Sequence, residues 1–249
     1  MHFEVTILFL SLLLSHLIAD FHWQPYTWVQ DRNRYHFRSR KLRWHCAIHT
    51  IVGFMVLASW THYVGWQEYI YAAWLALIIG LSHFVIDVAK SYSSGNTLAF
   101  LLDQAAHIMV LMWVSVLMLD ISLAALLLKP QSPLAEILVV VIGYALVVNP
   151  CSVFISITLE KWPWLRPPSD SLPKAGHYIG VLERILILTF VLLGEFTAVG
   201  FVLAAKSIFR FGDLTASKEK QLTEYVMLGT LLSVVTTVLI GIAVRQLIA

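Results

Sequence analysis

Charged side chains are scarce in this sequence. Asp, Glu, Lys and Arg make up 13% of the 249 residues, whereas soluble globular domains usually have about 25%. Hydrophobic residues make up 59% and the mean hydropathy is +0.76, so an ordinary soluble domain is excluded. The formal net charge is only +2, which gives no reason to expect a nucleic-acid partner. The composition therefore indicates an integral membrane protein surrounded by membrane lipids.

Cysteine is rare as well. The two cysteines, Cys46 and Cys151, each lie in or beside an apolar stretch. This position favours small buried side chains and excludes a disulfide framework. The N-terminal string "MHFEV" lacks the basic region of a signal peptide, so we expect the first apolar segment to remain as a membrane span.

Long apolar runs divide the chain into about seven predicted spans, most of them close to the ~20 residues that cross a bilayer as a helix. The predicted spans are residues 3–20, 45–62, 69–88, 99–119, 134–159, 177–205 and 224–247. The predicted fold class is therefore all-α, a polytopic transmembrane helix bundle. We expect a four-helix half over residues 1–125 and a three-segment half over residues 126–249, within one structural domain.

The sixth predicted span, residues 177–205, is too long for a simple crossing. At about 1.5 Å per residue it would extend for about 42 Å, against a hydrocarbon core of roughly 30 Å. A single tilted helix is the preferred prediction. The alternative is a break at Gly194 and Glu195 that turns the segment into a re-entrant hairpin.

Basic residues give the expected orientation in the membrane. The segment between the first two spans holds six of them: Arg32, Arg34, Arg38, Arg40, Lys41 and Arg43. The next loop, "THYVGWQE", has no Lys or Arg. The positive-inside rule therefore predicts that residues 21–44 are cytoplasmic.

Histidine and aspartate recur in pairs at one spacing. The pairs are His16 and Asp20, His45 and His49, His83 and Asp87, and Asp103 and His107. The two members of each pair are four residues apart, so on a helix they lie on one face about one turn apart. Four predicted spans therefore each present two polar side chains on a single face.

The order of the spans predicts that all four pairs lie at one level. The first and third spans carry their pairs at the end, and the second and fourth carry theirs at the beginning. Because consecutive spans run in opposite directions, every pair falls near the same membrane face, which the positive-inside rule makes the cytoplasmic one. Four helices that each offer two ligands at one depth are typical of a metal site in a bundle.

The residue types suit a divalent transition metal, zinc first, with iron or manganese as alternatives. Eight donors are too many for one tetrahedral zinc ion. The sequence thus predicts either two ions, or one ion surrounded by hydrogen bonds from aspartate to histidine. Hydrogen bonds between packed helices and a proton relay are the competing interpretations, and four pairs at matching depth favour the metal site over both.

Other polar residues are candidates for binding a substrate. Gln24, Lys90 and Gln104 each lie within four residues of a predicted ligand. In the back half, Lys206 and Arg210 share a helix face and suit a phosphate or carboxylate, unless they mark the end of a span. The short link "GDLTASKEKQLT" predicts a hairpin that returns Glu224 close to these two cations.

The motifs together resemble a known family. "HLIADFHWQ", "WHCAIHT", "HFVIDVAK" and "DQAAH", in this order over about residues 8–115, resemble a bacterial integral-membrane family catalogued as domain of unknown function 3307. The back half is similar to the extension of its longer members. The polar positions of the family fall on His16, Asp20, Gln24, His45, His49, His83, Asp87, Lys90, Asp103, Gln104 and His107. The resemblance implies a bacterial inner membrane but no settled activity, although some membrane proteins of this kind are described as presumed metal-dependent hydrolases.

The sequence thus predicts a membrane-embedded metal-dependent hydrolase with a lipid or lipid-linked substrate. Asp20 or Asp87, whichever is less used as a ligand, would accept a proton from water. Lys90, Lys206 and Arg210 would steady the substrate anion. The alternatives are a di-iron oxidoreductase acting on an acyl or isoprenoid chain, and a metal or proton transporter. A transporter site is expected near the midplane of the membrane, whereas these pairs lie near one face.

Overall fold

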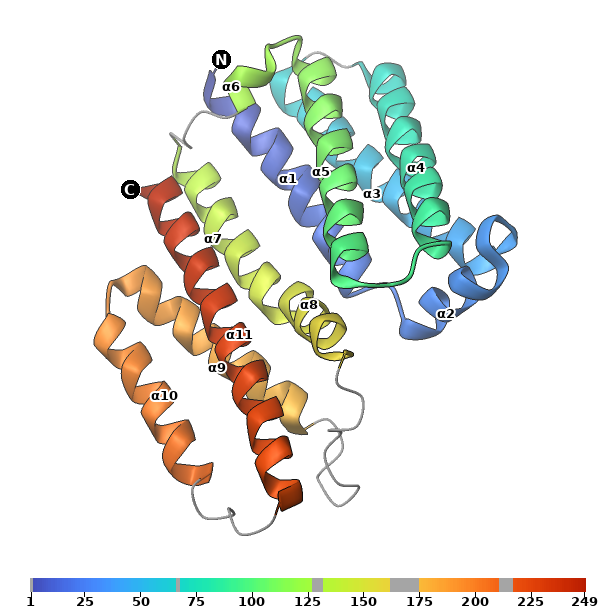
Figure 1. Cartoon of the computed structure of the whole chain (residues 1–249). Helices are drawn as coiled ribbons and strands as arrows, with labels where there is room; N and C mark the ends of the chain where they lie inside the picture. The colour runs from blue at the N-terminus through green and yellow to red at the C-terminus, as the bar shows by residue number, and fades with distance from the viewer. Residues whose placement is uncertain (1, 66–67, 127–131, 162–174, 211–216) are drawn as a thin grey trace. The chain divides into compact units, whose positions relative to one another are not determined.

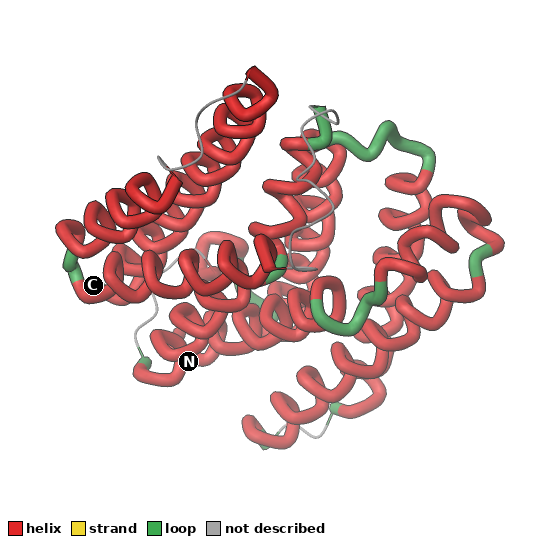
Figure 2. Tube along the Cα trace, turned by 90° about the horizontal axis from the view of Figure 1, so that it is seen from below, coloured by secondary structure: helices red, strands yellow, loops and turns green. Residues whose placement is uncertain are grey.

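The computed structural model describes residues 2–65, 68–126, 132–161, 175–210 and 217–249. Its elements are α1 (His2–Phe21), α2 (Tyr26–Tyr35), η1 (His36–Arg38), α3 (Arg40–Val64), α4 (Tyr69–Ser91), α5 (Thr97–Leu119), α6 (Leu123–Leu126), α7 (Pro133–Val148), α8 (Pro150–Leu159), α9 (Ala175–Leu193), α10 (Phe196–Arg210) and α11 (Ser217–Ile248). Figure 2 shows helices joined by loops, without a strand among the described residues. The predicted all-α class is confirmed.

Membrane spans account for most of these helices. Among the described residues, six helical segments are long and apolar enough to cross a membrane. They are Arg40–Val64, Tyr69–Ser91, Thr97–Leu119, Pro133–Leu159, Ala175–Leu193 and Thr223–Ile248. The first apolar helix counts as a seventh span together with α2, from which it is bent by 83°. The chain is therefore an integral membrane protein built as a polytopic helix bundle.

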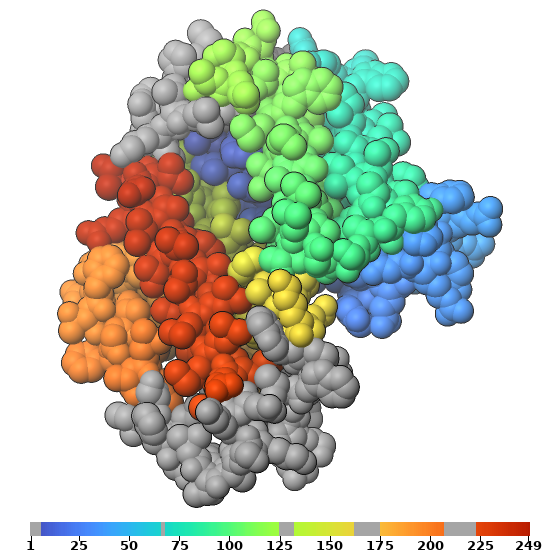
Figure 3. Space-filling view, viewed as in Figure 1, coloured from blue at the N-terminus to red at the C-terminus, as the bar shows by residue number. Residues whose placement is uncertain are grey.

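Two compact units make up the chain, Met1–Ile142 and Gly143–Ala249. In the first unit α1 packs on α3 and α5, and α4 packs on the same two helices, so these four helices form a closed ring of neighbours (Figure 1). In Figure 3, α4 and α5 lie against each other and form one face of this unit. The boundary predicted near residue 125 stays a prediction.

The apolar core of the first unit fills one half of the ring. Its buried members are Leu8, Leu12, Leu57, Trp60, Ala72, Leu75, Ala76, Ile79, Leu111, Val114 and Met118. These residues belong to the first half of α1 and α4 and to the second half of α3 and α5. The four His/Asp pairs take the opposite halves of the same helices, so they lie together at the other end of the ring.

A glycine sets the spacing between α3 and α4. A Cβ atom added at Gly80 would lie 1.9 Å from Thr50 Oγ1 and 3.3 Å from the carbonyl oxygen of Cys46. The hydroxyl of Thr50 donates a hydrogen bond to that same oxygen, 3.0 Å away, which fixes its position. Only glycine therefore allows the close approach that brings α4, with His83 one turn further on, against the first turns of α3.

In the second unit the chain reverses after α9. Gly194 has a φ of +82°, and two hydrogen bonds close the end of the helix, from Glu195 N to Phe190 O (2.8 Å) and from Gly194 N to Val191 O (3.1 Å). This is the Schellman arrangement, which stops a helix at a left-handed residue. The preferred prediction of a single tilted helix over residues 177–205 is therefore wrong, because the segment breaks at Gly194 and Glu195 into two helices. Re-entry of this hairpin into the membrane stays a prediction.

Packing confirms that α10 returns alongside α9. Lys206 Nζ lies 2.6 Å from Glu183 Oε2, although the two residues are 23 positions apart in the chain. Val199 of α10 joins Ile187 and Val191 of α9 in a small buried cluster. The charges of Lys206 and Glu183 thus neutralise each other within the hairpin.

A buried arginine joins α9 to the end of α7. Arg184 donates from Nε to the carbonyl oxygen of Val147 (2.5 Å) and from Nη2 to that of Val148 (3.0 Å) and to Ser152 Oγ. These carbonyls lie where α7 ends, just before Pro150, which has no N–H to continue the helical bonding. Arg184 therefore satisfies backbone groups that the break leaves open.

Both cysteines are buried and unpaired, as predicted.

We expect the Gly80→Ala variant to lose about 1–3 kcal/mol in free energy of unfolding, since overpacking a tight helix contact forces the backbones apart. The measurement is thermal or denaturant unfolding in detergent. Gly200→Ala is the control, because nothing lies within 4 Å of an added Cβ there. Equal stability of the two variants would contradict the close-contact interpretation.

Candidate metal centre

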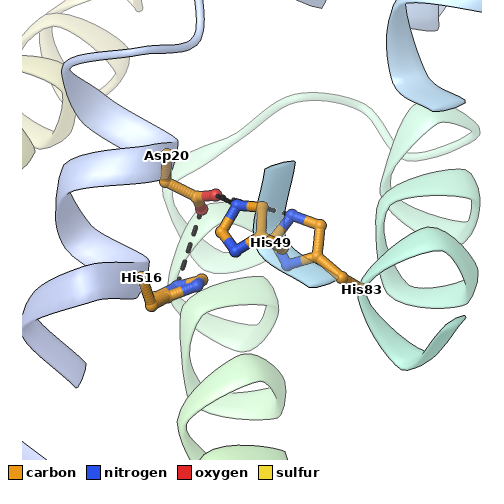
Figure 4. Close-up of side chains that lie close together, drawn as sticks. All are labelled: His16, Asp20, His49 and His83. Carbon is orange, nitrogen blue, oxygen red and sulfur yellow. Dashed lines mark ion pairs between the residues drawn. The ribbon is translucent and has the colours of Figure 1, made fainter. Parts of the chain in front are cut away.

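Asp20, on the last turn of α1, is the centre of the polar end of the ring. Its Oδ1 lies 2.9 Å from His49 Nε2 and 3.2 Å from His45 Nε2, both on α3. The same oxygen is 3.4 Å from His83 Nε2 on α4. Its Oδ2 lies 3.6 Å from His16 Nε2, one turn earlier on α1. Figure 4 shows His16, His49 and His83 turned toward this carboxylate from three different helices.

The imidazole rings also contact one another. The ring of His83 stacks on that of His49, with centroids 3.7 Å apart, and on that of His107, with centroids 4.0 Å apart. His45 Nε2 faces His83 Nε2 at 3.1 Å, and the His16 ring lies 5.1 Å from that of His107. All five histidines are buried. They therefore form one continuous group rather than separate helix contacts.

Two further aspartates border this group, and each has a cation. Asp87 Oδ1 accepts a hydrogen bond from Arg32 Nη1 of α2, 2.7 Å away. Asp103 Oδ2 pairs with Lys90 Nζ at the end of α4. Both carboxylates are buried, as is Arg32. The polar end therefore includes two ion pairs as well as the imidazoles.

Gln104 links two of the carboxylates. Its Nε2 lies 3.1 Å from Asp103 Oδ2 and 3.3 Å from Asp20 Oδ2. The neighbouring turn of α5 brings His107 Nε2 to 3.6 Å from Asp103 Oδ1. One helix thus connects Asp20 on α1 with the Lys90 ion pair on α4.

We call the eight side chains of the four pairs the His/Asp cluster. Several of its buried ligand atoms have no hydrogen-bond partner: His16 Nε2, Asp20 Oδ1, His45 Nδ1, His49 Nε2, Asp87 Oδ2, Asp103 Oδ1 and His107 Nε2. Among the described side chains, the one other buried atom of this kind is Trp60 Nε1. His49 Nε2 and Asp20 Oδ1 approach closely without hydrogen-bond geometry. Buried polar atoms without a partner are costly, so their concentration here makes the cluster a candidate site for a bound ligand.

The donor set fits a metal ion. One ligand atom each from His16, Asp20, His49 and His83 lies within 4.8 Å of the others. Neighbouring ligands of a tetrahedral zinc ion, with bonds of about 2.0–2.1 Å, are about 3.4 Å apart. The distances from the Asp20 oxygens to the three imidazole nitrogens are 2.9, 3.4 and 3.6 Å. Imidazole nitrogen and carboxylate oxygen both bind zinc in proteins.

Two overlapping groups of possible ligands adjoin the first. One consists of His45, His83 and Asp87, and the other of Asp87, Asp103 and His107. Both share residues with a neighbouring group, and both use carboxylates that already contact Arg32 or Lys90. They are therefore less free to bind an ion than the set around Asp20.

The structure thus brings together all eight residues of the predicted pairs, with Lys90 and Gln104 beside them. Gln24 lies beyond the end of α1 at Phe21, so it does not share a helix face with Asp20. Gln24 lies in the bend before α2 and makes no hydrogen bond or ion pair within the described part of the chain. The roles of the eight paired residues as metal ligands, and of Gln24, Lys90 and Gln104 as substrate contacts, stay predictions.

The predicted basic pair of the back half is arranged differently. The expected return of Glu224 close to Lys206 and Arg210 stays a prediction. Among the described residues, Lys206 forms an ion pair with Glu183 of α9 and none with Glu224. The hairpin accounts for this, because it returns Lys206 toward the beginning of α9. Arg210 ends α10, and its side chain lies outside the described residues.

The ion pair of Arg32 with Asp87 was not predicted from the sequence. There Arg32 was interpreted only as part of the basic segment that orients the chain. Arg32 reaches the cluster because α2 bends by 83° from α1 and packs on α3 and α4. His36 fixes the next turn, since its ring stacks on Tyr92 at 4.0 Å and its Nδ1 lies 2.8 Å from Ser91 Oγ. The signal was available, because a buried aspartate near the end of a span needs a cation and this segment supplies one.

Comparison with known proteins identifies the family to which the chain belongs. A family model described as "Protein of unknown function (DUF3307)" matches residues 8–134, slightly more than half of the chain and the part that holds the whole His/Asp cluster. No curated protein and no solved structure matches. The resemblance carried by the four motifs is therefore confirmed, and it assigns no activity.

We expect the Arg32→Gln variant to lose about 3 kcal/mol or more in free energy of unfolding, because it leaves the buried Asp87 carboxylate without its cation. Arg34→Gln, on the exposed side of the same helix, should change stability by no more than about 0.5 kcal/mol. Chemical denaturation in detergent measures both.

The double variant Arg32→Gln/Asp87→Asn tests the cause of that loss. Removing both charges should recover much of the stability, because the two positions interact directly. A double variant no more stable than Arg32→Gln alone would show that the ion pair is not the source of the effect.

Proposed function

The chain belongs to the DUF3307 family of proteins of unknown function, and we propose that it is a membrane-embedded metal-dependent hydrolase acting on a lipid or lipid-linked substrate. The observation that carries this proposal is the convergence of buried imidazoles from three helices on the Asp20 carboxylate, within a cluster in which several buried ligand atoms lack a hydrogen-bond partner. Such a set is costly in an apolar bundle unless a ligand binds it. A divalent transition metal satisfies nitrogen and oxygen donors together.

His16, Asp20, His49 and His83 would hold the ion, with zinc preferred and iron or manganese as the other metals that this donor set accepts. The remaining members of the His/Asp cluster would orient these ligands by hydrogen bonds. His45 is placed for this role toward Asp20, because its Nε2 lies 3.2 Å from Asp20 Oδ1. Such surrounding contacts typically change metal affinity by about 10–100-fold.

A bound divalent ion supplies Lewis-acid activation of a water molecule and of the scissile carbonyl or phosphoryl oxygen. Asp87 then serves as the general base. Arg32 holds its Oδ1, and its Oδ2 has no hydrogen-bond partner and lies 3.8 Å from His83 Nε2. The water oxygen bonds to the carbonyl carbon or phosphorus, its proton passes to Asp87, and that proton leaves with the alcohol as the ester bond breaks. Asp20, surrounded by imidazoles, acts as a ligand instead.

A lipid substrate is proposed from the depth of the site. The cluster lies at the ends of α1 and α4 and the beginnings of α3 and α5, where spans approach the headgroup region. The basic residues of α2 and the turn that follows it support a location at the cytoplasmic face of a bacterial inner membrane. A transporter site is expected nearer the midplane, so the position of the cluster favours the enzyme.

Metal content tests the first step of this proposal. Protein purified without metal-affinity chromatography should contain a transition metal by elemental analysis. His49→Ala and His83→Ala should each weaken binding by more than about tenfold, since loss of a ligand costs at least as much as loss of a surrounding contact.

His62→Ala is the matched control, because His62 is exposed and its ring bonds to Tyr69, away from the His/Asp cluster. Wild-type protein that stays free of metal after incubation with zinc, iron or manganese would refute the metal centre. Bound iron in place of zinc would favour an oxygen-activating enzyme over a hydrolase.

The two aspartates should respond differently to removal of their charge. Asp20→Asn should lose both metal and turnover. Asp87→Asn should keep its metal and lose turnover by about 10²–10⁴-fold, the usual contribution of a general base. Hydrolysis of phospholipid or lipid-linked ester substrates in mixed micelles, measured beside metal content, distinguishes the two. Full activity of the metal-loaded Asp87→Asn variant would remove Asp87 from the mechanism.

A further inference from the structure

The carboxylates of the site are not equivalent. Asp87 already contacts Arg32 at 2.7 Å, and Asp103 already contacts Lys90. Asp20 has no Lys or Arg partner among the described side chains, and its neighbours are imidazoles and Gln104. Arg32 and Lys90 thus each neutralise one of these two carboxylates, so a second divalent ion bound to Asp87 and Asp103 would lie beside two cations.

Charge balance points the same way. Three carboxylates and two cations, with neutral imidazoles as metal ligands require, leave the site with a net charge of minus one. One divalent ion changes this to plus one, whereas two would make it plus three. Buried sites in membrane proteins avoid uncompensated charge. One divalent ion together with one monoanion gives a neutral site.

The two cations retain hydrogen-bond donors for such an anion. Lys90 has three N–H donors, of which Asp103 takes one, and its side chain is 21% exposed. Arg32 uses Nη1 for Asp87 and Nε for Asn33, while its Nη2 makes no hydrogen bond within the described part of the chain. Ligand oxygens of Asp87 and Asp103 lie within 4.8 Å of each other, so both cations border one small region.

The location of the site favours one kind of monoanion. Arginine and lysine together suit phosphate oxygens, arginine through its planar fork and lysine as a point charge. Near the ends of membrane spans, a phosphodiester group is the monoanion that lipid headgroups supply. A phosphodiester has one negative charge, whereas a monoester has close to two at neutral pH.

We propose that the site binds a single divalent ion and that Lys90 and Arg32 bind a phosphodiester group beside it. This proposal rests on the proposed function and narrows its substrate class to monoanionic phosphodiesters, such as those of phospholipids. Neutral esters would lack the charge that the site needs for balance.

Zinc stoichiometry is the first test. The full-length protein in detergent, incubated with excess zinc and freed of unbound metal, should contain one zinc ion per chain by elemental analysis. Two zinc ions per chain would overturn the single-ion site while leaving the metal-dependent hydrolase intact. Protein that binds neither zinc nor, in parallel incubations, iron or manganese would instead refute the proposed function itself.

Ligand binding is the second test. Zinc-loaded protein is titrated by calorimetry with dibutyl phosphate, a soluble diester monoanion, and in parallel with neutral tributyl phosphate and inorganic phosphate. We expect dibutyl phosphate to bind at least tenfold more tightly than either of the others. Tight binding of the neutral triester would overturn the charge argument. Equal or tighter binding of inorganic phosphate would assign the region to free phosphate instead of a diester.

Variants of the two cations complete the test. Lys90→Gln and Arg32→Lys should each weaken dibutyl phosphate binding at least tenfold, and Arg32→Lys keeps a positive charge next to Asp87. Lys41→Gln is the control, since Lys41 is exposed and its ammonium lies over Trp28 at 5.8 Å, outside the site. Unchanged affinity in both site variants, with one zinc still bound, would show that Lys90 and Arg32 only support the fold.

Discussion

The buried carboxylate of Asp20 is the constraint on which the first unit depends. A charged group inside an apolar helix bundle needs partners, and Asp20 has four imidazoles within 3.6 Å, contributed by three helices. Those helices must approach closely, which Gly80 allows between α3 and α4. The apolar core at the opposite end of the ring packs the same helices through buried aliphatic side chains and Trp60. Packing and polar chemistry therefore occupy separate halves of one four-helix arrangement.

Much of this arrangement follows from the sequence. The spacing of four within each pair gives a shared helix face, and alternation between span ends and span beginnings gives a shared level. Both depend only on local helix geometry and chain order, so they hold without knowledge of tertiary packing. The different surroundings of the carboxylates do not follow from helix geometry and chain order. Asp20 lies among imidazoles while Asp87 pairs with Arg32, and that difference depends on where α2 packs.

Two features needed the three-dimensional structure for a similar reason. Arg32 belongs to a polar segment whose composition fits an orienting loop equally well, and only the 83° bend after α1 brings it to Asp87. The reversal at Gly194 was one of two alternatives, because a glycine inside an apolar run is compatible with both a helix and a turn. In each case the direction in which the chain turns after a helix decides between two structures that the same sequence pattern allows.

The contacts of Asp20 also have a consequence for how the protein enters the membrane. Within the first unit, α1 and α3 precede α4 and α5 in the chain, and they already contain Asp20 with His45 and His49, its nearest imidazoles. The third, α4, adds His83, and α5 adds Gln104. The nearest partners of this carboxylate thus lie on the next long helix of the chain. The pair of helices α1 and α3 can shield Asp20 before α4 and α5 are added. The ionisable groups of this apolar chain can therefore be paired step by step during insertion. They need not all be exposed to lipid without partners at the same time.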